Sequence, residues 1–481
     1  MSVKKEQIDT FLAIASDAAQ AILKSIERGE SIHVSSHYDA DGLTAAGIIG
    51  KAMARLGGRI RIRVERWTDE KIISEMAAEN FPLTIFSDLG SGYLTLLKNG
   101  LSKQRLIILD HHQPVGETPP NSIHVNPHLC GIDGSRDLSA AGVAYFVAKA
   151  LDEVNVDLAH LAVVGALGDM QDKYGQRELG CTNKIIVDDA VRAGCLEVET
   201  DLLFFGRQTR PIHKALACTT NPFLPGISGE EDKSLAFLAS LGITPKCADK
   251  WRAMRDLSEE EKRKLFSAIA DHLASKGFPS DVAMKLVGTV YTLTCEEPWT
   301  PLRDGREFAV LLNATGRMDK PGLGVAVCMG DRGASLEQSI AVLEEYRRTL
   351  MKYLSWLNEK PGRIEELNSI YVVRGGDFIN EKVIGAVSSI LSTNLPNPQK
   401  PIIAFSTIPG ESSVKISART LDVMTSKGLN LGEIMGVAAE KYSGRGGGHD
   451  IAAGAQVPVK DVESFLKLVD ELVKKQLRGT T

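Results

Sequence analysis

The chain has 481 residues and a formal net charge of -5, with 43% hydrophobic and 24% charged residues. At roughly 100–200 residues per domain, this length indicates two to four domains, and the composition is ordinary for a globular protein. The sequence contains no run of about 18 apolar residues that could span a membrane, and a periodic helix follows the basic N-terminus in place of a signal-peptide core. We therefore expect a cytoplasmic protein without membrane contact. Because the total charge is negative, a binder of nucleic acid must gather its positive groups in one groove.

The seven cysteines stand far apart and form no CxxC pair, so neither a zinc cluster nor a disulfide framework is indicated. An odd number in a chain without a secretion signal fits reduced thiols. We expect these cysteines to be small buried hydrophobic residues. They lie at positions 130, 181, 195, 218, 247, 295 and 328.

Apolar residues at helical spacing predict a first helix over residues 8–28, and short apolar runs then alternate with helical patterns as far as residue 169. This alternation predicts a mostly parallel, doubly wound α/β sheet. The predicted strands are 32–36, 60–65, 83–88, 105–110 and 122–126, and the predicted helices are 42–58, 69–80, 138–153 and 157–169.

Helical stretches such as 258–277 dominate the middle of the chain, and one long amphipathic helix over 335–359 is predicted to bridge two domains. The C-terminal part alternates again, with strands at 369–376, 401–408 and 414–419 and helices at 380–392, 429–442 and 462–477. We therefore expect an α/β catalytic domain over 1–200, a mostly helical insertion over 201–335, a connecting helix over 336–360 and a smaller α/β domain over 361–481.

Acidic and imidazole side chains fall at the ends of successive predicted strands and helices. Ligands of open α/β sheets collect at the carboxyl ends of the strands, so these groups are expected to meet in one crevice. Two cations about 3.5–4 Å apart need a bridging carboxylate and two or three further ligands each, and mixed imidazole and carboxylate donors suit Mn²⁺ and are compatible with Mg²⁺. An aspartate after a strand is often only a helix cap, but so many at successive ends favour a two-metal site. The six candidate ligands are His37, Asp39, Asp41, Asp88, His111 and Asp169.

The motif HYDADG (37–42), Asp88 and the triplet 110–112 resemble the motifs of the DHH phosphoesterase family, and Asp169 resembles its fourth motif. At the other end, SAR (417–419) and GGGH (446–449) resemble the DHH-associated substrate-binding domain, DHHA1. The whole chain is similar to archaeal RecJ-like proteins, which are related to the scaffold subunit of the eukaryotic replicative helicase.

The resemblance implies a division of labour. His37 and Asp39 are expected to hold one metal, and Asp88 to bridge it to a second metal. Asp110 is expected to orient a histidine from behind, and His112 to contact the scissile phosphate. The second metal is expected to be held by Asp41, His111 and Asp169. Bacterial relatives carry an acid where this chain has His37, which alters one ligand; we expect two divalent ions, with Mn²⁺ preferred and Mg²⁺ as the alternative.

Substrate contacts are expected in two places. Glycines let backbone N–H groups approach a phosphate, and a charged side chain beside them adds contacts; the alternative for 444–448 is a flexible turn. Arg207 and Arg210, with Lys214, line either a nucleic-acid path or a solvated face. Phe204, Phe205, Tyr371 and Trp299 are expected in the core, and Asp172 on the surface. The candidates in the C-terminal domain are Ser417, Arg419, Gly447, Gly448 and His449.

The leading interpretation is a metal-dependent exonuclease on single-stranded DNA or RNA, acting in replication or repair. Two alternatives stay open: a phosphodiesterase of short oligonucleotides, and a scaffold of the replicative helicase that binds GINS and MCM without cleaving anything. A degenerate scaffold should have lost ligands, and all six are present here. A pyrophosphatase is disfavoured because the length suggests a larger substrate.

Overall fold

The computed structural model describes residues 3–219, 222–360, 362–392 and 399–478. The chain divides into two compact units, Met1–Leu343 and Glu344–Thr481. The division falls within one long helix, α14 (Ala334–Glu359). This helix confirms the one predicted over 335–359. In the part of the chain that is described, no helix is long and apolar enough to cross a membrane.

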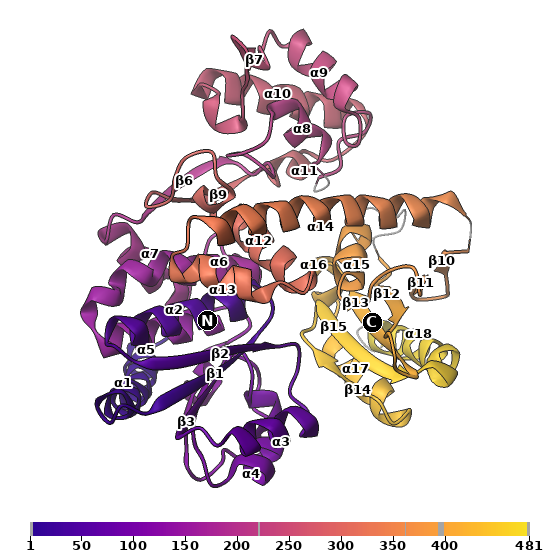
Figure 1. Cartoon of the computed structure of the whole chain (residues 1–481). Coiled ribbons are helices and arrows are strands. Elements are labelled where there is room, and N and C mark those ends of the chain that lie inside the picture. The colour runs from indigo at the N-terminus through magenta and orange to yellow at the C-terminus, as the bar shows by residue number, and fades with distance from the viewer. Residues whose placement is uncertain (1–2, 220–221, 361, 393–398, 479–481) are drawn as a thin grey trace. The chain divides into compact units, whose positions relative to one another are not determined.

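The first unit is built on a five-stranded sheet in the order β2-β1-β3-β4-β5, in which every neighbouring pair is parallel (Figure 1). The carboxyl ends of all five strands therefore lie at one edge. The strands β1, β3 and β4 are almost wholly buried, and β3 and β4 are mostly apolar, as expected where helices cover both faces of a parallel sheet. The predicted parallel, doubly wound arrangement is confirmed. The strands are β1 (Ser31–His37), β2 (Arg59–Glu65), β3 (Leu83–Ser87), β4 (Arg105–Leu109) and β5 (Ser122–Val125).

Helices cover both faces of this sheet. On one face α2 packs against β1, with α5, α6 and α1 beside it. On the other face α3 and α4 form a core with Phe86 and Ile108. The side chain of Asp39 caps α2, and that of Ser139 caps α5. The helices are α1 (Lys5–Glu27), α2 (Ala40–Arg55), α3 (Glu70–Glu79), α4 (Leu94–Leu101), α5 (Ala140–Leu151), α6 (Ala159–Gly168) and α7 (Cys181–Arg192).

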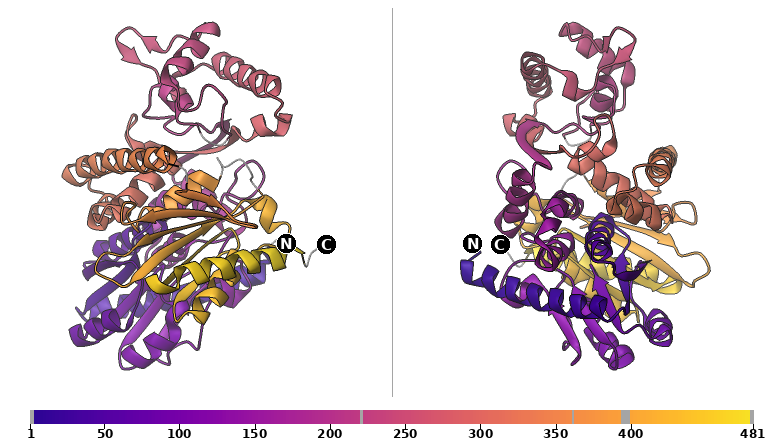
Figure 2. Two further views of the ribbon diagram at one scale, coloured as in Figure 1. Left: turned by 90° about the vertical axis from the view of Figure 1, so that its right-hand side faces the viewer. Right: turned by 60° about the vertical axis from the view of Figure 1, so that its left-hand side comes forward.

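A mostly helical insertion leaves the first unit through an antiparallel ribbon of β6 and β9, which pair from Leu196 and Leu293 to Leu202 and Val287. Figures 1 and 2 show the helices α8 to α11 beyond this ribbon, and they enclose a core of their own. The sequence pattern predicted helices here but missed the ribbon, because β6 is largely exposed and carries acidic residues at alternate positions. The elements of the insertion and its ribbon are β6 (Leu196–Leu202), α8 (Ile212–Ala217), α9 (Glu231–Ser240), β7 (Lys246–Cys247), β8 (Lys250–Trp251), α10 (Glu259–Ser275), α11 (Ser280–Met284) and β9 (Val287–Leu293). After the ribbon, α12 (Gly305–Arg317) and α13 (Pro321–Met329) pack against α6 and α2.

The second unit contains a mixed six-stranded sheet in the order β10-β11-β12-β13-β15-β14, in which β11 and β12 are parallel (Figure 2). Helices α17 and α18 build the main core on one face, against residues such as Ile416 and Ala418. Because side chains alternate along a strand, Ser417 and Arg419 point to the other face, which α15 covers. The elements are β10 (Ile364–Glu366), β11 (Tyr371–Gly376), α15 (Ile384–Ser392), β12 (Ile402–Thr407), β13 (Ser413–Arg419), α16 (Asp422–Thr425), α17 (Leu431–Lys441), β14 (Arg445–Gly448), β15 (Ala452–Pro458) and α18 (Val462–Arg478).

Three burial expectations are wrong. Among the cysteines only Cys328 is buried, and three are exposed. Trp299 is 53% exposed and stacks under the guanidinium of Arg255 at 4.0 Å, so a charged partner replaces the expected core. Asp172 is buried rather than on the surface, because Arg177 and Arg306 both donate hydrogen bonds to its Oδ2. Phe204 and Tyr371 are buried as expected, and Phe205 is half-buried.

Candidate metal centre

The six predicted ligands meet at the carboxyl edge of the first unit's sheet. His37 is the last residue of β1, and Asp88 and Asp110 each follow the last residue of a strand, β3 and β4. Asp169 follows the end of α6. The ligand atoms form overlapping groups, within each of which all atoms lie within 4.8 Å of one another. Two of these groups are His37 with Asp39 and Asp88, and Asp41 with His111 and Asp169.

Asp88 stands between the two groups. Its Oδ2 lies 3.3 Å from Nδ1 of His37, and its Oδ1 lies 3.3 Å from Nε2 of His111. The backbone of Asp88 has a φ of +57°, a conformation that aspartate and asparagine adopt more readily than most residues. Its N–H donates to the carbonyl of Leu109 over 2.9 Å, which ties this turn to the neighbouring strand.

His37 and Asp39 form the open side of the site. Nδ1 of His37 lies 3.0 Å from Oδ2 of Asp39, while Oδ1 of Asp39 accepts the N–H of Gly42 over 3.0 Å. Asp39 is therefore a helix cap with one oxygen and faces the cluster with the other, so the cap and the ligand interpretations are compatible. Their side chains remain partly accessible, at 23% for His37 and 38% for Asp39.

Asp41 and His111 form the buried side of the site, at 2% and 1% exposure. The two oxygens of Asp41 accept the N–H groups of Ala140 and Ala141 over 2.7 and 2.9 Å, at the first turn of α5, where the helix dipole favours an anion. The Nδ1 of His111 donates to the carbonyl of Gly134 over 2.7 Å. This bond leaves Nε2 of His111 as the ring nitrogen that carries the lone pair, and Nε2 faces Asp41 and Asp88.

Asp110 lies beside the cluster and accepts several hydrogen bonds. Its Oδ1 accepts Nδ1–H of His112 and the backbone N–H of His111, each over 2.8 Å, and its Oδ2 accepts the N–H of Ser91 over 2.8 Å. Burial alone would raise the pKa of Asp110, but His112 and these donors hold it well below its usual range. Asp110 is therefore an anion that orients His112, whose side chain is 45% exposed.

The electrostatics of the cluster show an excess of buried negative charge. Burial, and then the charge of Asp88, raises the pKa of Asp41 to about 8. Burial also raises the pKa of Asp169. Burial would lower the pKa of His37, but Asp39 and Asp88 outweigh it and raise that pKa well above the usual value. Carboxylates this close repel one another unless cations or protons lie between them.

The donor set fits divalent cations. Oδ1 of Asp88 is buried without a hydrogen-bond partner among the residues that the structure describes, and a buried unpaired carboxylate oxygen is costly unless a cation is bound to it. Nε2 of His111 and the carboxylate oxygens around it are donors that Mn²⁺ and, for the oxygens, Mg²⁺ accept.

Several residues around the site carry no signal in the sequence. Gln171 donates through Nε2 to Oδ2 of Asp169 and to the carbonyl of Gly134, over 2.9 and 2.8 Å, and it thereby connects Asp169 to the residue that holds His111. Asn126 donates to the carbonyl of His112 over 2.9 Å. Both amides follow the ends of secondary-structure elements, which is too common a position to single them out.

Gly134 has no room for a side chain. A Cβ at this position would stand 2.0 Å from the carbonyl oxygen of His111. We expect Gly134→Ala to displace His111, to lower the free energy of unfolding by about 1–3 kcal/mol, as overpacking does, and to weaken metal binding. Denaturant unfolding and metal titration test this. Gly322→Ala, where a Cβ meets nothing within 4 Å, should leave both unchanged; equal effects of the two substitutions would contradict the expectation.

In the second unit, the register of the strands brings the predicted substrate residues together. Ser417 pairs with Gly454, which in turn pairs with Gly447 on β14. The Nε of Arg419 donates to Oγ of Ser389 on α15 over 2.9 Å. Gly447 and Gly448 have φ values of +158° and +137°, and residues 445–448 form a strand rather than a flexible turn. His449 follows this strand and is half-buried.

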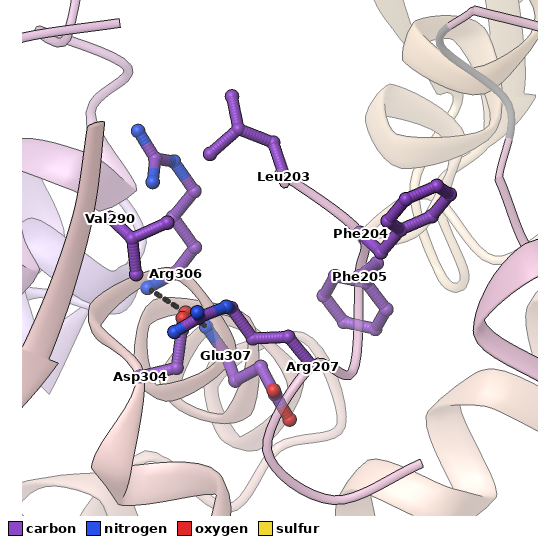
Figure 3. A pocket seen from close by; sticks show the side chains of 8 residues that line it. All are labelled: Leu203, Phe204, Phe205, Arg207, Val290, Asp304, Arg306 and Glu307. Atoms are coloured by element: carbon purple, nitrogen blue, oxygen red, sulfur yellow. Dashed lines mark hydrogen bonds between the residues drawn. The ribbon is translucent and has the colours of Figure 1, made fainter. Parts of the chain in front are cut away.

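The basic residues near 210 are not a free cationic surface. Arg207 is 4% exposed, and its guanidinium is bound to Asp201 at the base of the insertion, which counts against a contact with nucleic acid. Arg210 lies over the ring of Phe205, 5.0 Å from its centroid. A small cavity of about 80 Å³ beside the ribbon is lined by Leu203, Phe204, Phe205, Arg207, Val290, Asp304, Arg306 and Glu307 (Figure 3). It contains none of the six candidate ligands.

Three family models match the chain: the N-terminal domain of the DHH family over residues 31–166, the DHH-CID domain over 204–287 and the DHHA1 domain over 368–475. The uncharacterized protein MJ0831 of Methanocaldococcus jannaschii is 34% identical over 454 residues, which cover 93% of this chain and 94% of that protein. The single-stranded-DNA-specific exonuclease RecJ of Thermus thermophilus is 30% identical over 191 residues, 36% of this chain but 28% of that protein.

Solved structures show the same fold. RecJ from Thermus thermophilus in complex with Mn²⁺ matches with a TM-score of 0.59 and 19% identity, over 96% of this chain and 55% of that chain. CDC45 from Entamoeba histolytica matches with a TM-score of 0.63 and 13% identity, over 96% of this chain and 99% of that chain. The chain therefore belongs to the DHH family of phosphoesterases, as a RecJ-like hydrolase with DHH, DHH-CID and DHHA1 domains. This confirms the resemblance found in the sequence.

Proposed function

We propose that the protein is a metal-dependent exonuclease that hydrolyses phosphodiester bonds of single-stranded nucleic acid, in DNA replication or repair. The observation that carries the proposal is the convergence of six imidazole and carboxylate groups at the carboxyl edge of the sheet, with Asp88 between the two halves of the cluster. The sequence relative RecJ of Thermus thermophilus is a single-stranded-DNA-specific exonuclease, which supports the choice of substrate.

We propose two divalent cations, with Mn²⁺ preferred to Mg²⁺. His37, Asp39 and Asp88 would hold one cation, and Asp41, Asp88, His111 and Asp169 the other. When bound, such cations polarise phosphoryl oxygens and lower the pKa of water. The Thermus RecJ structure in complex with Mn²⁺ supports this choice, and so do the two imidazoles in the donor set, because imidazole suits Mn²⁺ better than Mg²⁺.

The chain's own residues would position the substrate. Asp110 fixes the ring of His112 through Nδ1, so the exposed imidazole is oriented to donate a hydrogen bond to a phosphate oxygen. In the second unit, Ser417 and Arg419 lie on one face of β13, and the adjacent Gly447 and Gly448 add backbone in conformations that favour glycine. These groups of the second unit would bind a phosphate of the substrate.

The test uses single strands of DNA and RNA that carry a label at the 5′ or the 3′ end, incubated with Mn²⁺, Mg²⁺ or EDTA. We expect stepwise shortening from one end, present with Mn²⁺, weaker with Mg²⁺ and absent with EDTA. Comparison of the two end labels reveals the polarity, and comparison of the two sugars reveals the preference for DNA or RNA. Metal-dependent cleavage confined to oligonucleotides of a few residues would favour the short-oligonucleotide phosphodiesterase instead.

A scaffold role is the second candidate. The fold shared with CDC45 over 99% of that chain favours it. If no strand is cleaved although Mn²⁺ binds, the exonuclease proposal fails, and association with GINS and MCM in a pull-down becomes the expected property.

A further inference from the structure

A second cluster of metal-binding side chains lies away from the carboxylate site. His160, Cys195 and Cys295 each offer one ligand atom, and the three atoms lie within 4.8 Å of one another. A tetrahedral ion with bonds of about 2.0–2.3 Å to nitrogen and sulfur needs donor atoms somewhat closer than this. Small side-chain rotations would bring the three atoms to that spacing, because Cys295 is exposed and Cys195 is only partly buried.

His160 is oriented for such a role. It is 8% exposed, and its Nδ1 donates to the carbonyl of Asp157 over 2.6 Å. This bond leaves Nε2 as the ring nitrogen with the lone pair. A carbonyl that fixes the remote ring nitrogen is the usual arrangement behind a metal-bound histidine. Glu296 lies close by, with Oε1 4.0 Å from Nε2 of His160, and Arg332 holds its carboxylate.

The three residues come from three parts of the chain that meet at the root of the insertion. Cys195 immediately precedes β6, and Cys295 follows shortly after β9, so the thiols lie at the same end of the ribbon. Two backbone contacts hold this end together: Thr294 N–H donates to the carbonyl of Cys195 over 3.0 Å, and the Thr294 hydroxyl donates to that of Gly194 over 2.7 Å. His160 lies in the first turn of α6, whose other end carries Asp169.

We propose that His160, Cys195 and Cys295 form a zinc site that fastens both strands of the ribbon to α6. Two thiolates and one imidazole bind zinc in preference to the hard cations Mn²⁺ and Mg²⁺. The fourth position is open to water or to the carboxylate of Glu296. The site is distinct from the carboxylate cluster in position and in donor chemistry, so occupation of one does not require the other.

Cobalt tests the proposal directly, because Co²⁺ bound to thiolate absorbs through sulfur-to-metal charge transfer and the carboxylate cluster contains no sulfur. The full chain is freed of metal with a chelator, kept in a reductant without thiols and titrated with Co²⁺. We expect a charge-transfer band that saturates at one ion per chain and disappears when Zn²⁺ is added. Cys195→Ser and Cys295→Ser should each weaken the Co²⁺ affinity measured from this band by more than about 100-fold. Loss of a residue that only hydrogen-bonds to a metal ligand already costs up to about 100-fold in metal affinity.

The matched control is Cys247→Ser, which removes an exposed cysteine of the insertion and should keep the band. A measurement on the unaltered chain covers the case in which the serine variants fold poorly. Zn²⁺ should protect Cys195 and Cys295 from alkylation in the reduced protein, while Cys218 and Cys247 react with and without the metal. No charge-transfer band, a band that survives both serine substitutions, or a Cys195–Cys295 disulfide that forms without any metal uptake would overturn the proposal.

Discussion

Replacing Asp88 by asparagine should lower the rate of phosphodiester hydrolysis by at least about a thousandfold, which corresponds to about 4 kcal/mol of lost transition-state stabilisation. Asp88 is the group that both halves of the cluster share, through Oδ2 towards His37 and Oδ1 towards His111. Asparagine keeps the shape and tolerates the φ of +57°, so the backbone turn should survive. The loss of one negative charge and one donor oxygen should then weaken both metal positions.

The measurement is single-turnover cleavage of a labelled strand at saturating Mn²⁺, with the folded state checked by circular dichroism. Asp188→Asn is the matched control, because Asp188 is an exposed residue of α7 that pairs only with Lys184 among the ion pairs found in the described residues. It should cleave at the rate of the unaltered protein. Retention of more than about a tenth of the activity by a folded Asp88→Asn protein would show that Asp88 does not bridge the metals.

Acidification should destabilise the first unit through His33, at the centre of β1. This imidazole is fully buried, stacks on Phe81 at 5.0 Å and has both ring nitrogens without hydrogen-bond partners among the described residues. Burial lowers the pKa of His33 to about 4. Between pH 6.5, near the pKa of His33 in the unfolded chain, and about pH 4, its pKa in the folded chain, the imidazole is protonated in the unfolded chain but stays neutral in the folded chain. The free energy of unfolding therefore falls as the pH falls. At about 1.4 kcal/mol per pKa unit, the loss reaches about 3 kcal/mol at pH 4.

His33→Leu removes the titrating group with little change in volume. The difference in unfolding free energy between the two proteins should be constant above about pH 7 and should shift by about 3 kcal/mol in favour of the leucine variant as the pH falls to about 4. Urea-dependent hydrogen exchange of peptides from β1 measures the free energy of unfolding of the first sheet alone. Parallel pH profiles of the two proteins would be incompatible with the proposed cause.

The amino-acid sequence predicts the site best where an apolar strand pattern ends directly before a candidate ligand. The buried strands β3 and β4 are mostly apolar, and each is followed at once by an aspartate, so the sequence alone assigns Asp88 and Asp110 to the same edge. Parallel topology then forces these ends together. The roles assigned to the individual side chains, and the domain boundaries at 200, 335 and 360, stay predictions.

The remaining features depend on contacts between distant residues. Gln171 and Gly134 act through hydrogen bonds and a steric contact, which leave no periodic pattern in the sequence. The charge of Arg207 suggests exposure on a nucleic-acid path, yet Asp201 draws it into a buried ion pair. The thiols of Cys195 and Cys295 come together only because β6 and β9 pair, and the polar sequence of β6 hides that pairing.

The ribbon also determines how freely the insertion can change. Because Leu202 and Val287 are paired residues on adjacent strands, the two ends of the insertion lie about one strand spacing apart, near 5 Å. A tight turn could join them, so the segment between them is an interchangeable module whose length and surface can vary without moving the strand ends that carry the acidic cluster. Relatives with very different insertions could therefore share one catalytic edge.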